Sequence, residues 1–143
     1  MKISSENIAL ISKSSGLIEI HALEISKAMY ELLFSLYPEM KLFFKNAPSN
    51  QHQLLSETIA VYAVNINNIS MLKPALRKIA STHVRVGVQP EHYKIVEEVL
   101  LLAIEIVLRD EVTDELLQAW QEAIEYVSSL LMEMERTIKQ EET

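Results

Sequence analysis

The chain has 143 residues, of which 49% are hydrophobic, and its net charge at neutral pH is −7. This length fits one domain, which can bury roughly 68–70% of its unfolded surface. The acidic balance argues against a general nucleic-acid binder, because phosphate contacts need a basic surface. The absence of cysteine excludes disulfides, cysteine-ligated iron–sulfur clusters and a thiolate nucleophile, and it fits a reducing compartment.

The first residues, Met1–Glu6, lack the basic and then apolar run of a signal peptide. No window approaches eighteen uninterrupted apolar residues, so we expect no membrane span. The sequence therefore predicts a cytoplasmic protein with no membrane or nucleic-acid partner. Only two glycines and four prolines are present, which favours long helices joined by short corners.

Hydrophobic periodicity predicts an all-α chain of six to eight helices. Ser4 or Ser5 can cap a first short helix that ends near Ser14–Gly16, where glycine marks a corner. A longer helix follows and stops at Pro38, since the residue before a proline disfavours the α region. Pro38 can also begin a short helix that ends at Phe44. The inward face of the longer helix contains Ile18, Ala22, Ile25, Met29, Leu32 and Leu36.

Residues 45–50 are polar and read as a loop, after which Ser49 or Asn50 can cap a helix that closes at Asn67–Asn68. Thr113 is the expected N-cap of the final helix. We expect the last part of that helix, from residue 133 onward, to be solvated and frayed.

The stretch Pro74–Leu108 contains the residue of most interest, His83. Ile79 and Ala80 belong to the apolar stripe of a helix, and His83 lies four and three residues beyond them. Its imidazole should therefore face the interior. On the pattern alone, such a histidine is more often a hydrogen-bonded core residue than a metal ligand.

The residues after His83 predict a corner and a second apolar helix. Residues 84–88 alternate like a strand, but glycine interrupts them and we interpret them as an irregular corner. Gly87 permits a positive φ, and Pro90 suits the first turn of a helix. Tyr93 and Val96 begin the apolar row of that helix. A helix that ends after an inward histidine, followed by a corner and an apolar helix, is one way to build an axial ligand site.

Nearly the whole chain, from about residue 6 to residue 135, matches the pattern of one family. The matching segments are residues 29–34, 37–41, 62–68, 78–83 and 87–96, with Ala119-Trp120 in the final helix. They resemble the globin domain of flavohaemoglobins and the related bacterial single-domain haemoglobins. The resemblance implies a globin fold around a haem pocket, with residues 1–143 as a single domain and 136–143 as a frayed tail. The implied cofactor is haem b, bound without a covalent link.

The resemblance makes His83 the proximal histidine, the only protein ligand of the haem iron. Tyr93 and Glu135 match a tyrosine and a glutamate that hold this histidine from behind. An acceptor on the free ring N–H makes a histidine a stronger donor to a metal. Without the resemblance, Tyr93 would be interpreted as a core aromatic and Glu135 as an exposed charge of the tail.

On the other side of the implied haem, Tyr30 matches the tyrosine that binds the iron ligand, to which its hydroxyl could donate. Gln51 and Leu55 share a helix face and match the distal glutamine and an apolar residue that walls the pocket. The loop before Gln51 is a few residues shorter than usual. Gln51, His52 and Gln53 therefore compete for the distal place, and His52 could bind iron directly.

Two further residues are implied to contact haem. Phe44 matches a phenylalanine that packs on the porphyrin, although Phe43 beside it leaves the register open, and Val96 belongs to the apolar row that faces the pocket. His21 and His92 are interpreted as surface or helix-start residues with no role in ligation.

The chain departs from the family pattern at two places on its last two helices. Glu97 stands where family members usually have glycine, and Ile124-Glu125 stands where they have Tyr-Gly. A buried unpaired glutamate would be costly. Either these helices are spaced differently, or the glutamates face solvent or a neighbouring subunit.

The resemblance implies a protein that binds dioxygen, nitric oxide and carbon monoxide. The first hypothesis is a nitric oxide dioxygenase in which Tyr30, Gln51, Tyr93 and Glu135 assist catalysis and a separate reductase supplies electrons, because the flavin module of flavohaemoglobins lies outside these residues. The alternatives are an oxygen store, carrier or sensor without turnover, and a haem-free interaction module. We expect a monomer or a homodimer.

Overall fold

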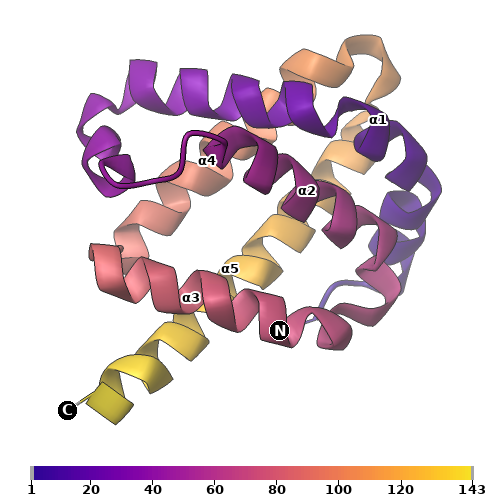
Figure 1. Cartoon of the computed structure of the whole chain (residues 1–143). Coiled ribbons are helices and arrows are strands. Elements are labelled where there is room, and N and C mark those ends of the chain that lie inside the picture. Colours follow the sequence, from indigo (N-terminus) through magenta and orange to yellow (C-terminus); the bar gives the residue numbers. More distant parts are fainter. Residues whose placement is uncertain (1, 143) are drawn as a thin grey trace.

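The computed structural model describes residues 2–142, which form five α-helices and three short 3₁₀ helices (Figure 1). No strand occurs within this range, so the all-α prediction of six to eight helices is confirmed. The elements in chain order are α1 (Ser5–Leu36), η1 (Pro38–Phe44), α2 (Gln51–Val64), η2 (Ile66–Leu72), α3 (Lys73–Val86), α4 (Pro90–Leu108), η3 (Arg109–Glu111) and α5 (Asp114–Glu142).

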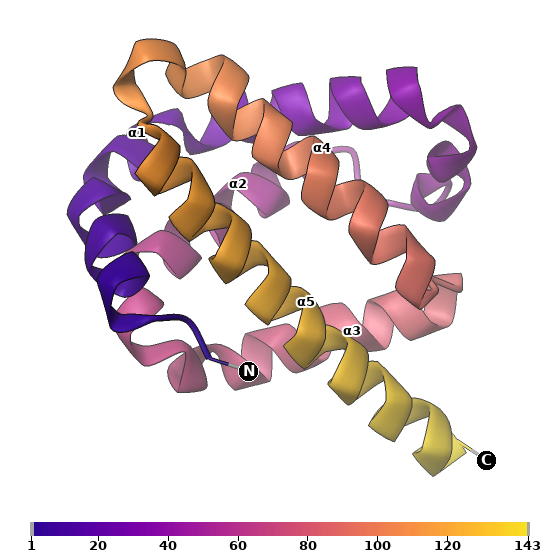
Figure 2. The same ribbon diagram turned by 180° about the vertical axis from the view of Figure 1, so that it is seen from behind.

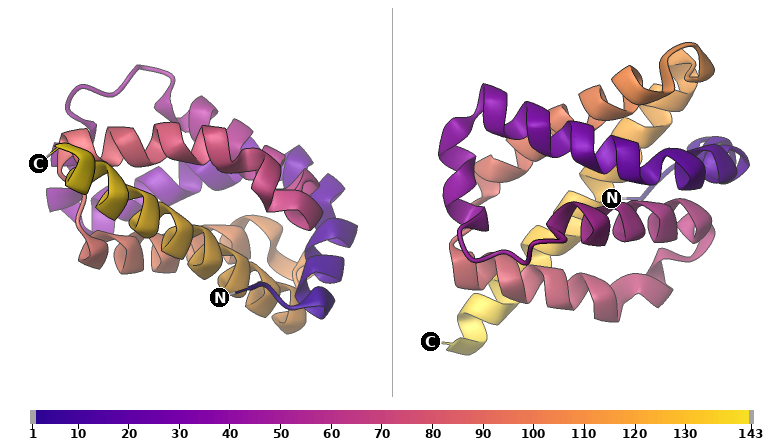
Figure 3. Two further views of the ribbon diagram at one scale, coloured as in Figure 1. Left: turned by 90° about the horizontal axis from the view of Figure 1, so that it is seen from below. Right: turned by 45° about the horizontal axis from the view of Figure 1, so that its top comes forward.

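The helices pack as two groups that α5 joins. The long helix α1 packs against α2, α4 and α5, whereas α3 packs mainly on α5 (Figures 1 and 2). Figure 3 shows from two further directions that α5 crosses the molecule and passes alongside α3 near its carboxyl end. The helix that carries His83 is therefore held by the end of the chain.

The hydrophobic core is divided in the same way. A large cluster joins α1, α2, α4 and the first half of α5, with Ile18, Leu33 and Val99 among its fully buried members. A second, smaller cluster has Leu76, Ala80, Tyr93 and Leu131 as its buried members. The second cluster packs α3 against α4 and α5, and one of its members, Tyr93, contacts His83.

The helix ends predicted at Ser4, Gly87, Pro90 and Thr113 are confirmed, whereas Asn50 precedes α2 without a side-chain capping bond. The side chain of Ser4 accepts a hydrogen bond from the backbone N–H of Asn7, and Thr113 Oγ1 accepts one from Leu116 N at 3.1 Å. Gly87 ends α3 with φ +91°, a left-handed conformation that a side chain disfavours. Pro90 lies in the first turn of α4, as expected.

The corner predicted near Ser14–Gly16 is wrong as a helix end, because α1 continues through it. The hydroxyls of Ser14 and Ser15 donate to the carbonyls of Ile11 and Ser12, three residues earlier, so both side chains bond to the helix backbone. Figures 1 and 2 show that α1 changes direction in its N-terminal part. The chain turns here by bending a helix.

Three other helix ends differ from the prediction. α2 ends at Val64, before Asn67–Asn68, and a 3₁₀ helix follows it. α3 continues to Val86, so the corner before α4 is shorter than residues 84–88. α5 continues to Glu142, so residues 136–142 of the expected frayed tail form helix, while residue 143 lies outside the described range. Burial of Leu131 and Glu135 against α3 and α4 extends α5 beyond the expected point.

Within residues 2–142, none of the helices combines the length and the apolar character that crossing a bilayer requires.

Leu33 and Leu36 test the core assignment as a matched pair on one helix. Leu33 is fully buried, whereas the inward position predicted for Leu36 is wrong, because its side chain is 54% exposed. We expect Leu33→Ala to lower the free energy of unfolding by about 2–5 kcal/mol, because it leaves a cavity. Leu36→Ala should change it by no more than about 0.5 kcal/mol. Urea denaturation followed by circular dichroism measures both, and equal effects would contradict the assignment.

Candidate functional site

His83 lies near the end of α3, and its side-chain hydrogen bonds to residues 2–142 all involve one ring nitrogen. Its Nδ1 lies 2.9 Å from the hydroxyl of Tyr93 on α4 and 3.3 Å from Oε2 of Glu135 on α5. Tyr93 donates its hydroxyl proton to the same Oε2 of Glu135. The structure thus brings together the three residues that the resemblance grouped, from three different helices. Their roles toward a bound ligand stay predictions.

The hydrogen bonds of this triad determine which ring nitrogen of His83 carries the proton. A carboxylate only accepts hydrogen bonds. The single hydroxyl proton of Tyr93 is already used in the hydrogen bond that Tyr93 donates to Glu135. Both neighbours of Nδ1 are therefore acceptors, so Nδ1 carries the hydrogen. The other nitrogen, Nε2, has no hydrogen-bond partner among residues 2–142, and the side chain is 30% exposed. A lone pair without a protein partner is left on Nε2.

The environment of Tyr93 keeps its hydroxyl protonated. Burial raises the pKa of Tyr93 well above its usual value, and the hydrogen bond to Glu135 and the charge of that carboxylate raise it further. Glu135 itself is only 5% exposed, so its carboxylate needs these polar partners to be tolerated. The two residues hold each other in place behind the imidazole.

A second polar pair joins α1 to the start of α2. Gln51 Nε2 donates a hydrogen bond of 3.1 Å to the hydroxyl oxygen of Tyr30. Burial raises the pKa of Tyr30, and the hydrogen bond from Gln51 opposes part of this rise. The tyrosine oxygen is thus an acceptor toward Gln51, and the structure gives its own O–H no acceptor within residues 2–142. That proton can be donated to a ligand.

Aromatic rings from η1 pack on this pair in a defined register. The ring of Phe44 lies edge-on to Tyr30 at 5.3 Å and to Phe34 at 5.4 Å between centroids. Phe43 instead packs against His92, with 4.7 Å between ring centroids. Of the two phenylalanines that the sequence left open, Phe44 is therefore the one beside Tyr30.

Of Gln51, His52 and Gln53, the fold brings only Gln51 to Tyr30, and its distal role stays a prediction. Gln51 contacts Tyr30, while the side chains of His52 and Gln53 are exposed. The cause is a residue that the sequence reasoning missed: buried Ser26 on α1 donates a hydrogen bond of 2.6 Å to the carbonyl of His52. A serine in the middle of an otherwise apolar helix face was the available signal. This bond fixes the rotation of the start of α2.

Four other residues singled out from the sequence divide into two that pack on the core and two histidines with local partners. Leu55 and Val96 are partly buried and pack against the large core cluster that also contacts Tyr30. His21 pairs with Glu24 on α1 at 3.1 Å. His92 accepts a hydrogen bond from the backbone N–H of Gln89 and so belongs to the start of α4. Both histidines have structural partners, as the sequence indicated.

Glu97 and Glu125, the departures from the family pattern, lie together at a surface groove between α4 and α5. The groove has a volume of about 520 Å³ and an apolar floor that includes Leu101 and Ile124. Both glutamates are half-buried, so neither is enclosed in the core. The helices accommodate them by leaving a groove open to solvent. The remaining lining residues are Lys94, Glu98, Leu102, Glu105, Leu117 and Gln121.

Comparisons of the sequence with known proteins agree with this geometry. A family model described as Globin matches residues 27–131. An uncharacterised globin-like protein of Aquifex aeolicus is 40% identical over 136 residues, which are 95% of this chain and 96% of that protein. A flavohemoprotein of Rhodopirellula baltica is 34% identical over 98% of this chain, but the match covers 35% of the flavohemoprotein. The chain thus spans about a third of the length of the flavohemoproteins it matches.

A solved structure of a similar protein has the same fold as this chain. An engineered carbene transferase from Rhodothermus marinus, assigned as a nitric oxide dioxygenase, superposes with a TM-score of 0.92. The two sequences are 36% identical, and the alignment covers 97% of each chain.

The raised pKa of Tyr93 predicts a pH dependence of stability. The tyrosine stays protonated in the folded protein above pH 10, whereas in the unfolded chain it loses its proton near that pH. Its contribution is therefore complete below about pH 10 and declines as the pH rises. Between about pH 10 and 11.5, the free energy of unfolding of the unsubstituted protein should fall more steeply than that of Tyr93→Phe, by about 1.4 kcal/mol per pH unit. Urea denaturation across this range measures the slopes, and parallel curves would refute the prediction.

Proposed function

This chain belongs to the globin family, as the resemblance predicted, and on that premise we propose that it is a haem globin with nitric oxide dioxygenase activity. The family supports haem as the bound group and diatomic gases as its ligands. The proposed reaction joins NO, O₂ and one electron to give nitrate. The electron comes from a reductase outside residues 1–143, and the haem is held without a covalent link.

The donor set of the site fits haem. The observation that carries the proposal is the state of His83: Nδ1 is hydrogen-bonded to Tyr93 and Glu135, and Nε2 has no hydrogen-bond partner in the described part of the chain. A neutral imidazole with one nitrogen held and the other free is the usual protein ligand of globin iron. Haem bound there would supply an iron that takes up dioxygen and accepts an electron.

Tyr93 and Glu135 have a positioning role in this proposal. They fix the tautomer and the orientation of His83, and the acceptor at Nδ1 makes the imidazole a stronger electron donor to a metal. In this proposal they favour electron release toward a bound gas, which a dioxygenase requires more than a reversible carrier does.

Tyr30 and Gln51 act on the ligand side. The proton of the Tyr30 hydroxyl has no acceptor among residues 2–142, so it can be donated where negative charge develops on a gas ligand. Gln51 restricts the rotation of that hydroxyl, and Phe44 packs against the tyrosine ring. The pair holds dioxygen tightly enough for nitric oxide to reach it before it leaves.

Replacing the histidine tests haem binding directly. We expect His83→Ala, titrated with haem after preparation of the haem-free protein, to lose the absorption spectrum of an imidazole-bound haem. His21→Ala, which removes a histidine paired with Glu24, should bind haem as the unsubstituted protein does. If His83→Ala retains the affinity and the spectrum of the unsubstituted protein, the chain is a haem-free or differently ligated module, and the proposal fails.

The Tyr30–Gln51 pair is tested with dioxygen and nitric oxide. Tyr30→Phe removes a hydrogen bond to a partly charged ligand, which is worth about 1.5–3 kcal/mol, so dioxygen should dissociate about 10–100 times faster. Stopped-flow displacement by carbon monoxide measures this rate. Nitrate formation under excess NO, with NADH and a flavin reductase, should continue over many turnovers in the unsubstituted protein. Nitrate limited to one equivalent per haem with every reductase would favour oxygen storage, transport or sensing.

A further inference from the structure

The charge of the chain is distributed unevenly around the helix that carries His83. Residues 58–90 contain no aspartate or glutamate, whereas the whole chain has 20 acidic residues and a net charge of −7. The cationic residues of this segment are Lys73, Arg77, Lys78 and Arg85, and all of them belong to α3. An acidic protein therefore has one basic helix.

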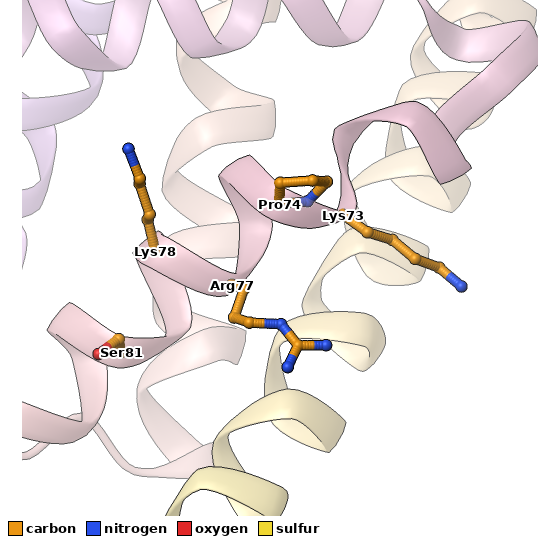
Figure 4. A pocket seen from close by; sticks show the side chains of 5 residues that line it. All are labelled: Lys73, Pro74, Arg77, Lys78 and Ser81. Atoms are coloured by element: carbon orange, nitrogen blue, oxygen red, sulfur yellow. The ribbon is translucent and has the colours of Figure 1, made fainter.

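Arg77 and Lys78 lie on the outward side of α3, and Lys73 lies at its exposed start. Leu76 and Ala80 are the buried residues of this helix. At 100° per residue, Lys78 and Ser81 project to the side opposite these two, and Arg77 lies beside Ser81. We call this surface, made of Lys73, Pro74, Arg77, Lys78 and Ser81, the basic face of α3. It borders a shallow hollow of about 400 Å³ (Figure 4).

The cations of the basic face are not used by the fold. Both ion pairs within residues 2–142 involve histidines, so no carboxylate of the described chain neutralises Lys73, Arg77 or Lys78. All five residues of the face are exposed. Unpaired like charges on one helix face repel one another slightly, which is a cost that an oppositely charged partner removes.

We propose that the basic face of α3 is the docking surface for an acidic protein that delivers electrons to the haem. This rests on the proposed function, because only a haem that must be re-reduced needs an electron donor. An acidic donor is repelled by most of the surface of this chain and attracted to α3. The charge pattern therefore steers the donor to one place.

The position of the face suits electron delivery. His83 belongs to the same helix, on its inward side, and an α-helix with its side chains is about 10–12 Å across. The cations of the basic face are therefore separated from the proximal imidazole by about one helix diameter across α3 and by roughly 8–15 Å along its axis. The acidic groove between α4 and α5 repels the same donor.

The arrangement of the side chains favours a protein over a small anion. Figure 4 shows the ends of Lys73, Arg77 and Lys78 pointing in different directions from the helix. A phosphate or carboxylate ligand needs donors that converge on one point. Charges spread along a helix face match a broad acidic surface instead.

The experiment uses the haem-loaded protein and an acidic flavodoxin, photoreduced to its hydroquinone, as the probe. The test variant carries Lys73→Glu, Arg77→Glu and Lys78→Glu. The matched control carries Lys13→Glu, Lys27→Glu and Lys41→Glu, which change the net charge equally at exposed positions of α1 and η1. Stopped-flow absorbance measures the second-order rate of ferric haem reduction against ionic strength.

At low ionic strength, we expect the test variant to be reduced at least about 10 times more slowly than the control variant. The difference should vanish near 1 M salt, where the screening length is about 3 Å. Reduction by dithionite, which needs no docking surface, should be equal in both. A variant with Lys73→Gln, Arg77→Gln and Lys78→Gln gives an intermediate rate and serves if the glutamate variant does not fold.

Three results would overturn the proposal. The first is equal slowing of the test and control variants, which assigns the effect to net charge alone. The second is suppression of flavodoxin reduction by millimolar phosphate at constant ionic strength, which makes the face a small-anion site. The third is concentration-dependent association in sedimentation that the test variant abolishes, which makes a second copy the occupant. A titration of the ferrous carbon monoxide form, followed by NMR, should place the perturbed amides on α3.

Failure of the proposed function gives a different result. If the chain does not bind haem, no Soret band forms and the reduction assay has no signal, while an NMR titration of the haem-free protein with flavodoxin still reports docking. If haem binds but nitrate is not formed in repeated turnovers, the flavodoxin rates still decide the docking surface.

Discussion

The hydrogen bonds among His83, Tyr93 and Glu135 connect three helices at one point, and the geometry of the site depends on them. The carboxylate of Glu135 is almost fully buried, so it requires donors, and Tyr93 supplies one. The imidazole of His83 completes the set with its N–H. The same bonds that make a buried charge tolerable fix the end of α5 against α3 and α4. They also leave the other ring nitrogen of the histidine without a protein partner.

The hydrophobic core is divided into two clusters, and each cluster holds one part of the candidate site. One cluster holds α1, α2 and the Tyr30–Gln51 pair, and the other holds α3 and the triad. Because α3 is fixed mainly through α5, its inward face is not occupied by packing against α2. In the proposed function, the haem and its gas ligand lie between the hydroxyl of Tyr30 and the Nε2 atom of His83. The fold separates the two kinds of chemistry that gas binding needs.

The sign of the surface charge also differs between two regions of the molecule. The groove between α4 and α5 is acidic, and the outward side of α3 is basic. Glutamates at two places where the family usually has small residues add to the acidic side, since Glu97 and Glu125 both line that groove. The helix that carries His83, the proposed iron ligand, thus has a basic outer side.

The sequence by itself determined the helical class, the inward direction of His83, and the ends at Pro38, Gly87 and Thr113, because periodicity, φ restriction and capping are local effects. It did not determine which residues would meet. The bond between Tyr93 and Glu135 joins positions 42 residues apart, and that between Ser26 and the start of α2 spans 26 residues. Such contacts depend on how helices cross and rotate against one another, so only the tertiary structure could select Gln51 over its neighbours or extend α5 to Glu142. Family resemblance proposed the partners of His83, and packing brought them within hydrogen-bonding distance.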